Sequence, residues 1–443
     1  MNLSDHPIFK KPRMIILFAI VVGLFARIVT IWHAPGHAFA VDQLFDTLAW
    51  NLVTLHQFTL DGVNPAAHVG PLYPAVLACF YSVVGHHPEW VSLLHVAFDL
   101  GTTWAIYRVA TVLWGSTVGA WTASLVFLYP AYWTYDPRIR SEALFTLLIS
   151  GWLWATIMCR QDPSFRRYAF MGLMAGFTIL CKPVVLILAA LVAGFIWIGP
   201  EGAVKNIGYT IIYGATCLAL VGPWSTRNYV VFHTIIPVSA GVGVGLWMGS
   251  DPASRGSWPM SAEQELAIWD TAGITPLPYA HAMYEVKTDR LLREKGMRRI
   301  AADPLSYLGL TFTRTWDFWV GNSFYLSGDE NGLVSGLRRY AAERGWTVTI
   351  YSLAKRLLLV PSLILVAACS AWVYRNRWRD LLPLYLFPLG LTAGYVPFTV
   401  EAGRYALPVL PCLMMLSVAA VSYWHNARLM LEHRQAVPQT MSA

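Results

Sequence analysis

The sequence predicts an all-α polytopic membrane protein, and three features of the chain lead to this fold class. The 443 residues are 56% hydrophobic and only 13% charged, whereas soluble domains carry about 25% charged residues. The apolar residues gather in blocks, most of them long enough to cross a hydrocarbon core of ~30 Å. Lys and Arg cluster at the ends of these blocks, which explains most of the net charge of +7 without nucleic acid. These features exclude a soluble enzyme, a disordered protein and a coiled coil.

The distribution of basic residues decides which apolar blocks cross the membrane. The blocks run over residues 14–32, 71–84, 90–113, 117–135, 141–159, 167–181, 183–199, 207–223, 351–374, 381–399 and 405–424. No Lys or Arg occurs between Arg27 and Arg108, so this stretch is expected outside. Block 71–84 is short for a span and is predicted to lie in the outer interface. About ten spans remain, with both chain ends in the cytoplasm.

This topology divides the chain into four regions. They are an N-terminal transmembrane module, 1–223, with a first outer loop, 33–89; an outer loop region, 224–350; C-terminal transmembrane helices, 351–425; and a cytoplasmic tail, 426–443. The outer loop region contains a basic stretch from Lys287 to Arg299. Long loops translocate largely regardless of charge, so this stretch is compatible with an outer location. It is expected either to lie on lipid headgroups or to bind an anionic substrate.

The first outer loop begins with an amphipathic segment. Its apolar residues recur at helical spacing and are Leu44, Phe45, Leu48, Ala49, Leu52 and Val53. Asp42 and Asp46, one turn apart, lie on the opposite side together with Asn51. The pattern predicts a helix on the membrane surface that presents two carboxylates. The alternative is a helix N-cap at Asp42 and an ordinary solvated acid at Asp46.

Several motifs occur in a recognisable order along nearly the whole chain. Asp42 follows the first span, a Leu-Ala-x-Asn-Leu helix core comes next, and Pro71-Leu-Tyr-Pro-Ala-Val-Leu-Ala78 starts the interfacial block. The later segments are Arg140–Phe145, Cys181–Pro183, Pro223–Tyr229, Gly241–Gly249 and Arg404–Pro411. In this arrangement the chain resembles the dolichyl-phosphate-mannose-protein mannosyltransferase-like glycosyltransferases, which belong to family 39 and have the GT-C fold.

The resemblance implies a GT-C transmembrane helix bundle with outer-face juxtamembrane helices and a large late outer loop. It also implies an inverting transferase that moves a sugar from a polyprenyl-phosphate donor to an acceptor on the outer face. Asp42 matches the family's acid after the first span, where a carboxylate can deprotonate the acceptor hydroxyl. Glu142 matches the family's second acid, although an acid at a helix start is equally a favourable dipole partner.

A departing phosphate is best stabilised by preorganised Lys or Arg side chains. The candidates at the outer ends of spans are Arg404, Arg227, Lys182 and Arg140. Two of them have competing explanations, because Arg404 could pair with Glu401 and Lys182 could merely extend to the interface. Further substrate-binding candidates are His68, Tyr73, Asp46 and Asn228, although Asp46 does not match the family position.

The chain departs from better-known relatives at two places. It has Asp42-Gln43 where some relatives have Asp-Glu, and Gly70 before Pro71 where some carry a basic residue. His68 is therefore a candidate to take part of the phosphate-binding role. The Gly241-Val-Gly-Val-Gly245 segment resembles a phosphate loop, but it follows no predicted parallel strand. We expect it to provide close backbone approach or flexibility.

The expected partners are a polyprenyl-phosphate-linked sugar, a lipid, glycan or protein acceptor, and membrane lipids, without nucleic acid. No cofactor is implied, and the metal requirement stays open. The expected location is an inner or plasma membrane, with the site facing the periplasm or exterior. A lipid-linked glycan ligase or polymerase is the alternative enzyme, although it would not require the acidic interfacial helix. A transporter or flippase is the alternative without transferase chemistry, although internal repeats are not visible.

Overall fold

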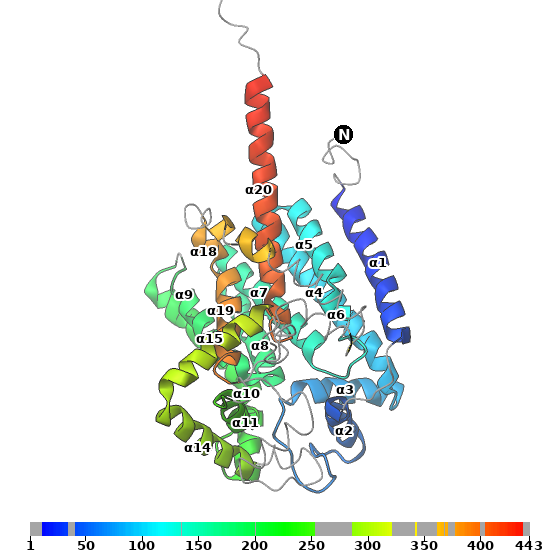
Figure 1. Cartoon of the computed structure of the whole chain (residues 1–443), viewed down its shortest axis with the longest axis vertical. Helices are drawn as coiled ribbons and strands as arrows, with labels where there is room; N and C mark the ends of the chain where they lie inside the picture. Colours follow the sequence, from blue (N-terminus) through cyan, green and yellow to red (C-terminus); the bar gives the residue numbers. More distant parts are fainter. Residues whose placement is uncertain are drawn as a thin grey trace, which may run out of the picture.

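The computed structural model describes the chain as a bundle of helices (Figure 1). The described residues are 11–33, 40–133, 135–199, 201–252, 286–320, 342, 361–366, 368–370, 377–398 and 404–436, without the side chains of 33, 40–42, 320 and 426–436. The α-helices are α1 (Pro12–His33), α2 (Ala40–Thr54), α3 (Leu72–Val84), α4 (Val91–Trp114), α5 (Ser116–Leu128), α6 (Pro130–Trp133), α7 (Glu142–Gln161), α8 (Phe165–Cys181), α9 (Leu186–Ile196), α10 (Ala203–Phe232), α11 (Val242–Gly249), α14 (Val286–Ala302), α15 (Pro304–Val320), α18 (Trp378–Leu381), α19 (Pro383–Tyr395) and α20 (Leu410–Ala436). Short 3₁₀ helices cover Pro88–Trp90, Pro183–Val185 and Leu407–Val409. The predicted all-α class is confirmed, since the described part contains a single isolated β-bridge and no named strand.

Four helical segments in the described part are long and apolar enough to cross a membrane. They are Pro12–Trp32, Glu142–Gln161, Ala203–Phe232 and Leu407–His425. On α1 the large apolar side chains Leu17, Phe18 and Phe25 are 62%, 68% and 69% exposed. Large apolar surface of this kind needs a lipid or protein partner, because water disfavours it. The membrane class is therefore supported by packing as well as by composition, while the count of about ten spans stays a prediction.

Two helices lie across the direction of the bundle at one of its ends. Figure 1 shows α2 and α3 crosswise at the bottom, whereas the N-terminal end of α1 and the C-terminal end of α20 lie at the top. Leu48 and Ala49 of α2 are fully buried, so the predicted apolar face of this helix is confirmed. Phe45 packs edge-on against Tyr73 of α3, with ring centroids 5.1 Å apart. These contacts fix the acidic helix onto the interfacial helix.

A buried charge cluster ties α1 and α4 to the segment that precedes α7. Arg27 of α1 is 1% exposed and donates a 2.5 Å hydrogen bond from Nη2 to Asp99 of α4. Its Nε lies 2.9 Å from an oxygen of Asp136, which is also 1% exposed. One cation thus faces two carboxylates within the bundle. Burial and the neighbouring Asp99 charge raise the pKa of Asp136 to about 8.

Stability should fall as the pH rises from about 4 to about 8, because folded Asp136 holds a proton that the unfolded chain has released. The free energy of unfolding should change with pH by at most about 1.4 kcal/mol per pH unit. Asp136→Asn imitates the protonated carboxyl and should flatten the dependence. Thermal unfolding in detergent between pH 4 and pH 8 measures this, with Asp162→Asn, an acid 71% exposed beside Arg167, as control. An unchanged slope in Asp136→Asn would remove Asp136 as its source.

The glycine-rich segment forms α11 and packs directly against α14. The Asp289 carboxylate of α14 accepts hydrogen bonds from the backbone N–H groups of Gly241 at 2.9 Å and Gly243 at 2.8 Å. A carboxylate at a helix N-terminus is favourable, because the N–H groups there have no partner within the helix. The expectation of close backbone approach is confirmed. The anion at this loop is a side chain of the protein itself.

Gly243→Ala should destabilise the fold by about 1–3 kcal/mol, the usual cost of overpacking. A Cβ at this position would clash with the carbonyl of Asp289 and lie 2.9 Å from the backbone nitrogen of Arg293. Gly214→Ala on α10 is the matched control, because its Cβ would meet nothing within 4 Å. Thermal unfolding of the two variants measures the difference. Equal stability would show that α11 and α14 separate easily.

Candidate active site

Three segments far apart in the sequence meet at the carboxylate of Glu142. Glu142 is the first residue of α7, Lys182 lies between α8 and the following 3₁₀ helix, and Arg404 lies shortly before α20. Lys182 donates a 2.8 Å hydrogen bond from Nζ to Glu142 Oε1. Arg404 donates to the same oxygen from Nε at 2.8 Å, and its Nη2 lies 2.6 Å away. The structure therefore brings together three of the residues proposed from the sequence.

The cluster is largely shielded from solvent. The side chains of Glu142, Arg404 and Lys182 are 5%, 11% and 18% exposed. Tyr405 lies beside both cations, with its ring centroid 6.0 Å from Lys182 Nζ and 5.6 Å from the Arg404 guanidinium. Charge pairs act more strongly in such surroundings than in water. The three side chains together carry one net positive charge. Arg140, another candidate phosphate-binding residue, is buried two residues before Glu142.

The two oxygens of Glu142 have different surroundings. Oε1 accepts the hydrogen bonds from both cations, whereas Oε2 is buried and, among the described residues, has no hydrogen-bond partner. Buried polar atoms are usually paired, so an unpaired carboxylate oxygen is unusual. Glu142 can therefore orient two cations with one oxygen and accept a hydrogen bond from a bound molecule with the other. Its place in the first turn of α7 is also favourable for an acid.

The loop that contains His68 lies against the backbone just before Lys182. A Cβ on Gly70 would lie 2.6 Å from the carbonyl oxygen of Cys181. Any side chain at this position would push the loop away from the end of α8. Close packing of this loop against the end of α8 therefore requires glycine at position 70. His68, two residues earlier, is 7% exposed in the same loop.

Tyr73 is connected to the segment before Glu142 through a histidine that the sequence reasoning missed. His95 of α4 is 1% exposed, with Nε2 2.8 Å from Tyr73 Oη and Nδ1 2.9 Å from the backbone carbonyl of Asp136. A carbonyl only accepts, so Nδ1 carries the proton and Nε2 accepts from the tyrosine. His95 thus holds Tyr73 in place. Charged residues inside apolar blocks, here Asp99 and Arg27, were the available signal for this buried network.

Asp46 contacts the far end of α3. It accepts a 2.6 Å hydrogen bond from Tyr81 Oη and lies 3.1 Å from His86 Nε2. The His86 ring stacks on Trp50, with centroids 4.4 Å apart. Burial and the Asp46 carboxylate raise the pKa of Tyr81 well above its ordinary value. Asp46 therefore stabilises the packing of α2 against α3. Its substrate-binding role stays a prediction.

The side chain of Asp42 lies outside the described residues, although its backbone belongs to α2. The helix places residue 42 one turn before Asp46, as the spacing predicts. Glu401, the alternative partner for Arg404, also lies outside the described residues. The proposed role of Asp42 therefore stays a prediction.

Arg227 and Asn228 make contacts that hold loops together. Arg227 donates a 2.9 Å hydrogen bond to the carbonyl of Ala66 and lies 4.8 Å from the Trp224 ring centroid. Asn228 is fully buried and donates to the carbonyls of Ile236 and Val238 at 3.1 Å. These contacts do not involve Glu142, in contrast to those of Lys182 and Arg404. The substrate-binding roles of Arg227 and Asn228 stay predictions.

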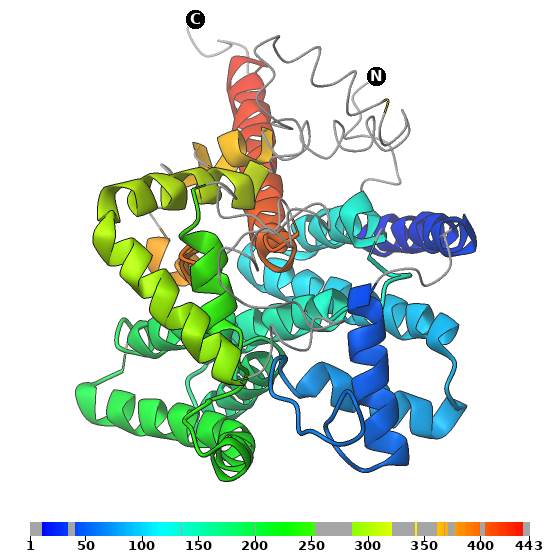
Figure 2. The same ribbon diagram turned by 60° about the horizontal axis from the view of Figure 1, so that its bottom comes forward.

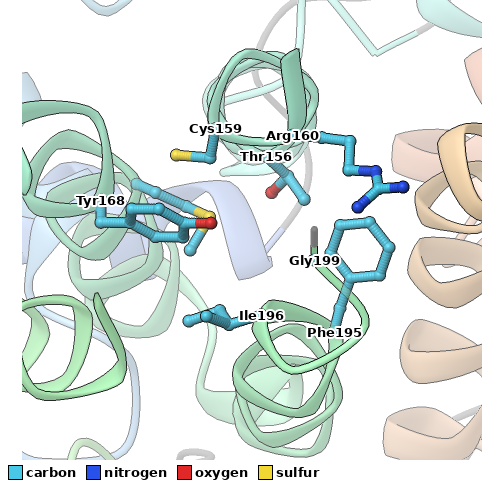
Figure 3. Close-up of a pocket in the computed structure, with 8 residues that line it drawn as sticks. Thr156, Cys159, Arg160, Tyr168, Phe195, Ile196 and Gly199 are labelled. Atoms are coloured by element: carbon cyan, nitrogen blue, oxygen red, sulfur yellow. The ribbon is translucent and has the colours of Figure 1, made fainter. Parts of the chain in front are cut away.

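A small cavity lies at the opposite end of α7 from Glu142 (Figure 3). Its lining residues are Thr156, Cys159, Arg160, Tyr168, Met171, Phe195, Ile196 and Gly199. It has room for about one water molecule, too little for a sugar. Within the described residues, no group of three or more His, Cys, Asp or Glu side chains is placed to hold a metal ion. The Glu142 cluster is therefore the best candidate site.

Comparison with known proteins supports the family resemblance. The family model described as dolichyl-phosphate-mannose-protein mannosyltransferase matches residues 68–226, which include Tyr73, Glu142 and Lys182. The resemblance noted from the sequence motifs is thereby confirmed over this segment. No curated protein sequence matches the chain significantly.

Solved structures share the fold at low sequence identity. The apo oligosaccharyltransferase of Archaeoglobus fulgidus has 10% identity and a TM-score of 0.54, covering 97% of this chain and 53% of its own. The oligosaccharyltransferase AglB of the same organism, in complex with an inhibitory peptide and a dolichol-phosphate, has 9% identity and a TM-score of 0.55, with 98% and 52% coverage. ArnT from Cupriavidus metallidurans bound to undecaprenyl phosphate has 12% identity and a TM-score of 0.42, with 89% and 77% coverage. The chain thus has the GT-C fold and spans about half the length of the oligosaccharyltransferase.

Proposed function

We propose that the chain is an integral-membrane glycosyltransferase that moves a sugar from a polyprenyl-phosphate donor to an acceptor hydroxyl. The observation that carries the proposal is the convergence of Lys182 and Arg404 on Glu142 within a GT-C fold. The matched family takes its name from a dolichyl-phosphate sugar donor. The similar oligosaccharyltransferase has been solved with a dolichol-phosphate, which supports the same class of carrier here.

The charges of the cluster suit the departure of a lipid phosphate. When the sugar leaves the carrier, the bond between the anomeric carbon and the phosphate oxygen breaks and negative charge grows on the phosphate. Lys182 and Arg404 are held in place before this charge develops, so little reorganisation is needed. Glu142 keeps the two cations close together despite their mutual repulsion. The buried Arg140 adds a further positive charge nearby.

Attack by the acceptor requires a base, and we assign this role to Asp42. A carboxylate positioned near the hydroxyl can take its proton as the new glycosidic bond forms. Glu142 Oε2 can accept a hydrogen bond from the donor sugar or the acceptor, which supports its assignment as the second acid. Attack opposite the leaving phosphate inverts the anomeric centre. His68 and Tyr73 lie on segments that border the site and remain substrate-binding candidates.

The proposed location is an inner or plasma membrane, with the site facing the periplasm or exterior. Support comes from the absence of Lys and Arg between Arg27 and Arg108, a stretch that includes α2 and α3. In this arrangement residues 1–223 form the transmembrane module that carries Glu142 and Lys182. Residues 224–350 form the outer region, residues 351–425 the C-terminal transmembrane helices that supply Arg404, and residues 426–443 the tail.

The direct test uses purified protein in lipid nanodiscs with radiolabelled polyprenyl-phosphate sugars and a membrane extract as acceptor. The proposal expects acceptor-dependent loss of sugar from the carrier and release of polyprenyl phosphate. A ligase would instead consume a pyrophosphate-linked glycan. A flippase in sealed vesicles would move the lipid across the membrane with the sugar still attached. Either of these last two results, without sugar transfer, would overturn the proposal.

A further inference from the structure

The inference concerns α14 and α15, which form the rim of the bundle on the side away from α1. Figure 2 shows the two helices at the edge of the molecule, with α14 beside α11. In Figure 1, α14 lies at the same end of the bundle as α2 and α3. Neither helix carries a residue of the proposed catalytic site. Their exposed surfaces are unlike those of helices that face water.

The polarity of α15 is reversed relative to a soluble helix. Its exposed face carries large apolar side chains at helical spacing, namely Leu305 (78% exposed), Leu308 (60%), Phe312 (80%) and Trp316 (53%). Its buried face carries polar groups, with Arg314 fully buried and Asp317 5% exposed. A helix in water places its apolar side inward. Exposure of the apolar side indicates a hydrocarbon environment.

The buried face of α15 is firmly attached to the bundle. Arg314 donates from Nε to the carbonyl of Val396 at 2.6 Å and from Nη1 to the carbonyl of Gly249. Tyr307 donates a 2.5 Å hydrogen bond to the carbonyl of Pro397. Rotating the helix to hide its apolar stripe would break all of these bonds. The stripe is therefore a fixed outward surface.

The neighbouring α14 exposes a basic face. Its exposed cations are Lys287, Arg290, Arg293 and Arg298. Leu291 and Met297 lie among them and are 41% and 53% exposed. The exposed Glu294 lies 3.8 Å from Arg290 and offsets one charge. Basic residues mixed with apolar ones are typical of helices that lie on anionic headgroups.

We propose that α14 and α15 together dock onto the bilayer. The apolar stripe of α15 inserts among the acyl chains of the leaflet nearest α2 and α3, and the basic face of α14 lies on anionic headgroups of that leaflet. With 17 residues, α15 is about 25 Å long, shorter than a hydrocarbon core of ~30 Å. We place it in one leaflet, because α14, which ends two residues before it, carries the cations that face the headgroups. This assigns the basic stretch to lipid headgroups and leaves the sugar donor to the Glu142 cluster.

The aromatic residues at the end of α15 link this surface to the candidate site. Phe318 lies 6.1 Å from Tyr395 between ring centroids. Tyr395 stacks on Tyr405 at 4.2 Å, and Tyr405 lies beside Lys182 and Arg404. Docking of α15 thus holds one wall of the site at a defined depth in the membrane. The docking itself does not depend on the proposed transferase activity.

The test measures the membrane depth of single fluorescent labels on the full chain, with Cys79 and Cys217 replaced by serine. A nitrobenzoxadiazole label at Phe312→Cys, in vesicles of phosphatidylcholine and phosphatidylglycerol, should be quenched several-fold more by acyl-chain nitroxide lipids than by aqueous iodide. A label at Arg298→Cys should respond most to a headgroup nitroxide. The control is Val63→Cys, 78% exposed in a polar turn, where iodide should dominate.

Three results would overturn the proposal. Iodide quenching at position 312 equal to that at position 63 would place the stripe in water. Protection of position 312 from both quenchers would show that another segment or a second copy of the chain covers it. Quenching at position 312 that does not rise with phosphatidylglycerol would refute the role of α14. The triple variant Arg290→Gln, Arg293→Gln, Arg298→Gln should abolish that dependence on the anionic lipid.

Discussion

Lys182→Met should lower kcat/KM for the polyprenyl-phosphate donor by about 100-fold or more, the usual effect of removing one preorganised charge-stabilising donor. Methionine keeps the length of the side chain and its packing near Phe145, whose ring centroid is 5.2 Å from Lys182 Nζ, but removes the charge. Arg404→Ala should have a comparable or larger effect. Arg404→Lys should retain part of the activity, because the charge remains while the planar fork is lost. The measurement is steady-state transfer with varied donor at saturating acceptor.

The matched control is Lys205→Met, which removes a lysine paired with an acid one helical turn away on an exposed surface. It should retain wild-type transfer and donor affinity. If Lys182 and Arg404 act only as structural partners of Glu142, their variants would lower the amount of folded protein, while kcat/KM for the donor per folded molecule would stay normal. An unchanged kcat/KM in purified, folded Lys182→Met and Arg404→Ala would therefore contradict the phosphate role.

The double variant Glu142→Gln with Lys182→Met tests whether Glu142 only orients the two cations or also takes part in the reaction. If Glu142 serves to hold the cations, the effects of the two single changes should overlap strongly, since each disturbs the same group. Removing only the carboxylate leaves two cations facing each other in a shielded site, which is costly. An effect on kcat that remains after Lys182 has gone would reveal a separate role for Glu142 Oε2.

Local features of the fold could be predicted from the sequence because they depend on neighbouring residues. The apolar spacing in α2 predicts which side is buried, and Leu48 and Ala49 confirm it. The glycines at 241 and 243 predict close backbone approach, which the contacts with Asp289 confirm. What the sequence could not supply was the anion at this loop, since Asp289 lies on a different helix.

Contacts between residues far apart in the sequence could not be predicted. Spacing offered Glu401, which lies outside the described residues, as one possible partner of Arg404, but it gave no indication of the contact between Arg404 and Glu142, which is 262 residues away. Nothing local in either segment indicates that contact. The same holds for His95, which joins Tyr73 to the carbonyl of Asp136 across three segments. These contacts depend on how the spans pack, and apolar periodicity alone does not determine that packing.

Asp42→Asn should lower turnover by at least about 100-fold, the usual scale for loss of a general base. Asparagine is nearly isosteric but cannot accept the proton of the attacking hydroxyl. Donor affinity should stay close to wild type, because the base acts on the acceptor and not on the phosphate. The effect should therefore appear in kcat, in contrast to the donor-binding defect expected for Lys182→Met.

Asp46→Asn is the matched comparison, because it changes the same residue type one turn away on the same helix. Its carboxylate accepts from Tyr81 and lies against His86, so the substitution should mainly loosen the contact between α2 and α3. We expect a modest loss of thermal stability and a much smaller loss of turnover than for Asp42→Asn. Equal turnover in Asp42→Asn and wild type would exclude Asp42 as the base. A collapse of turnover in Asp46→Asn alone, with stability unchanged, would move that role to Asp46.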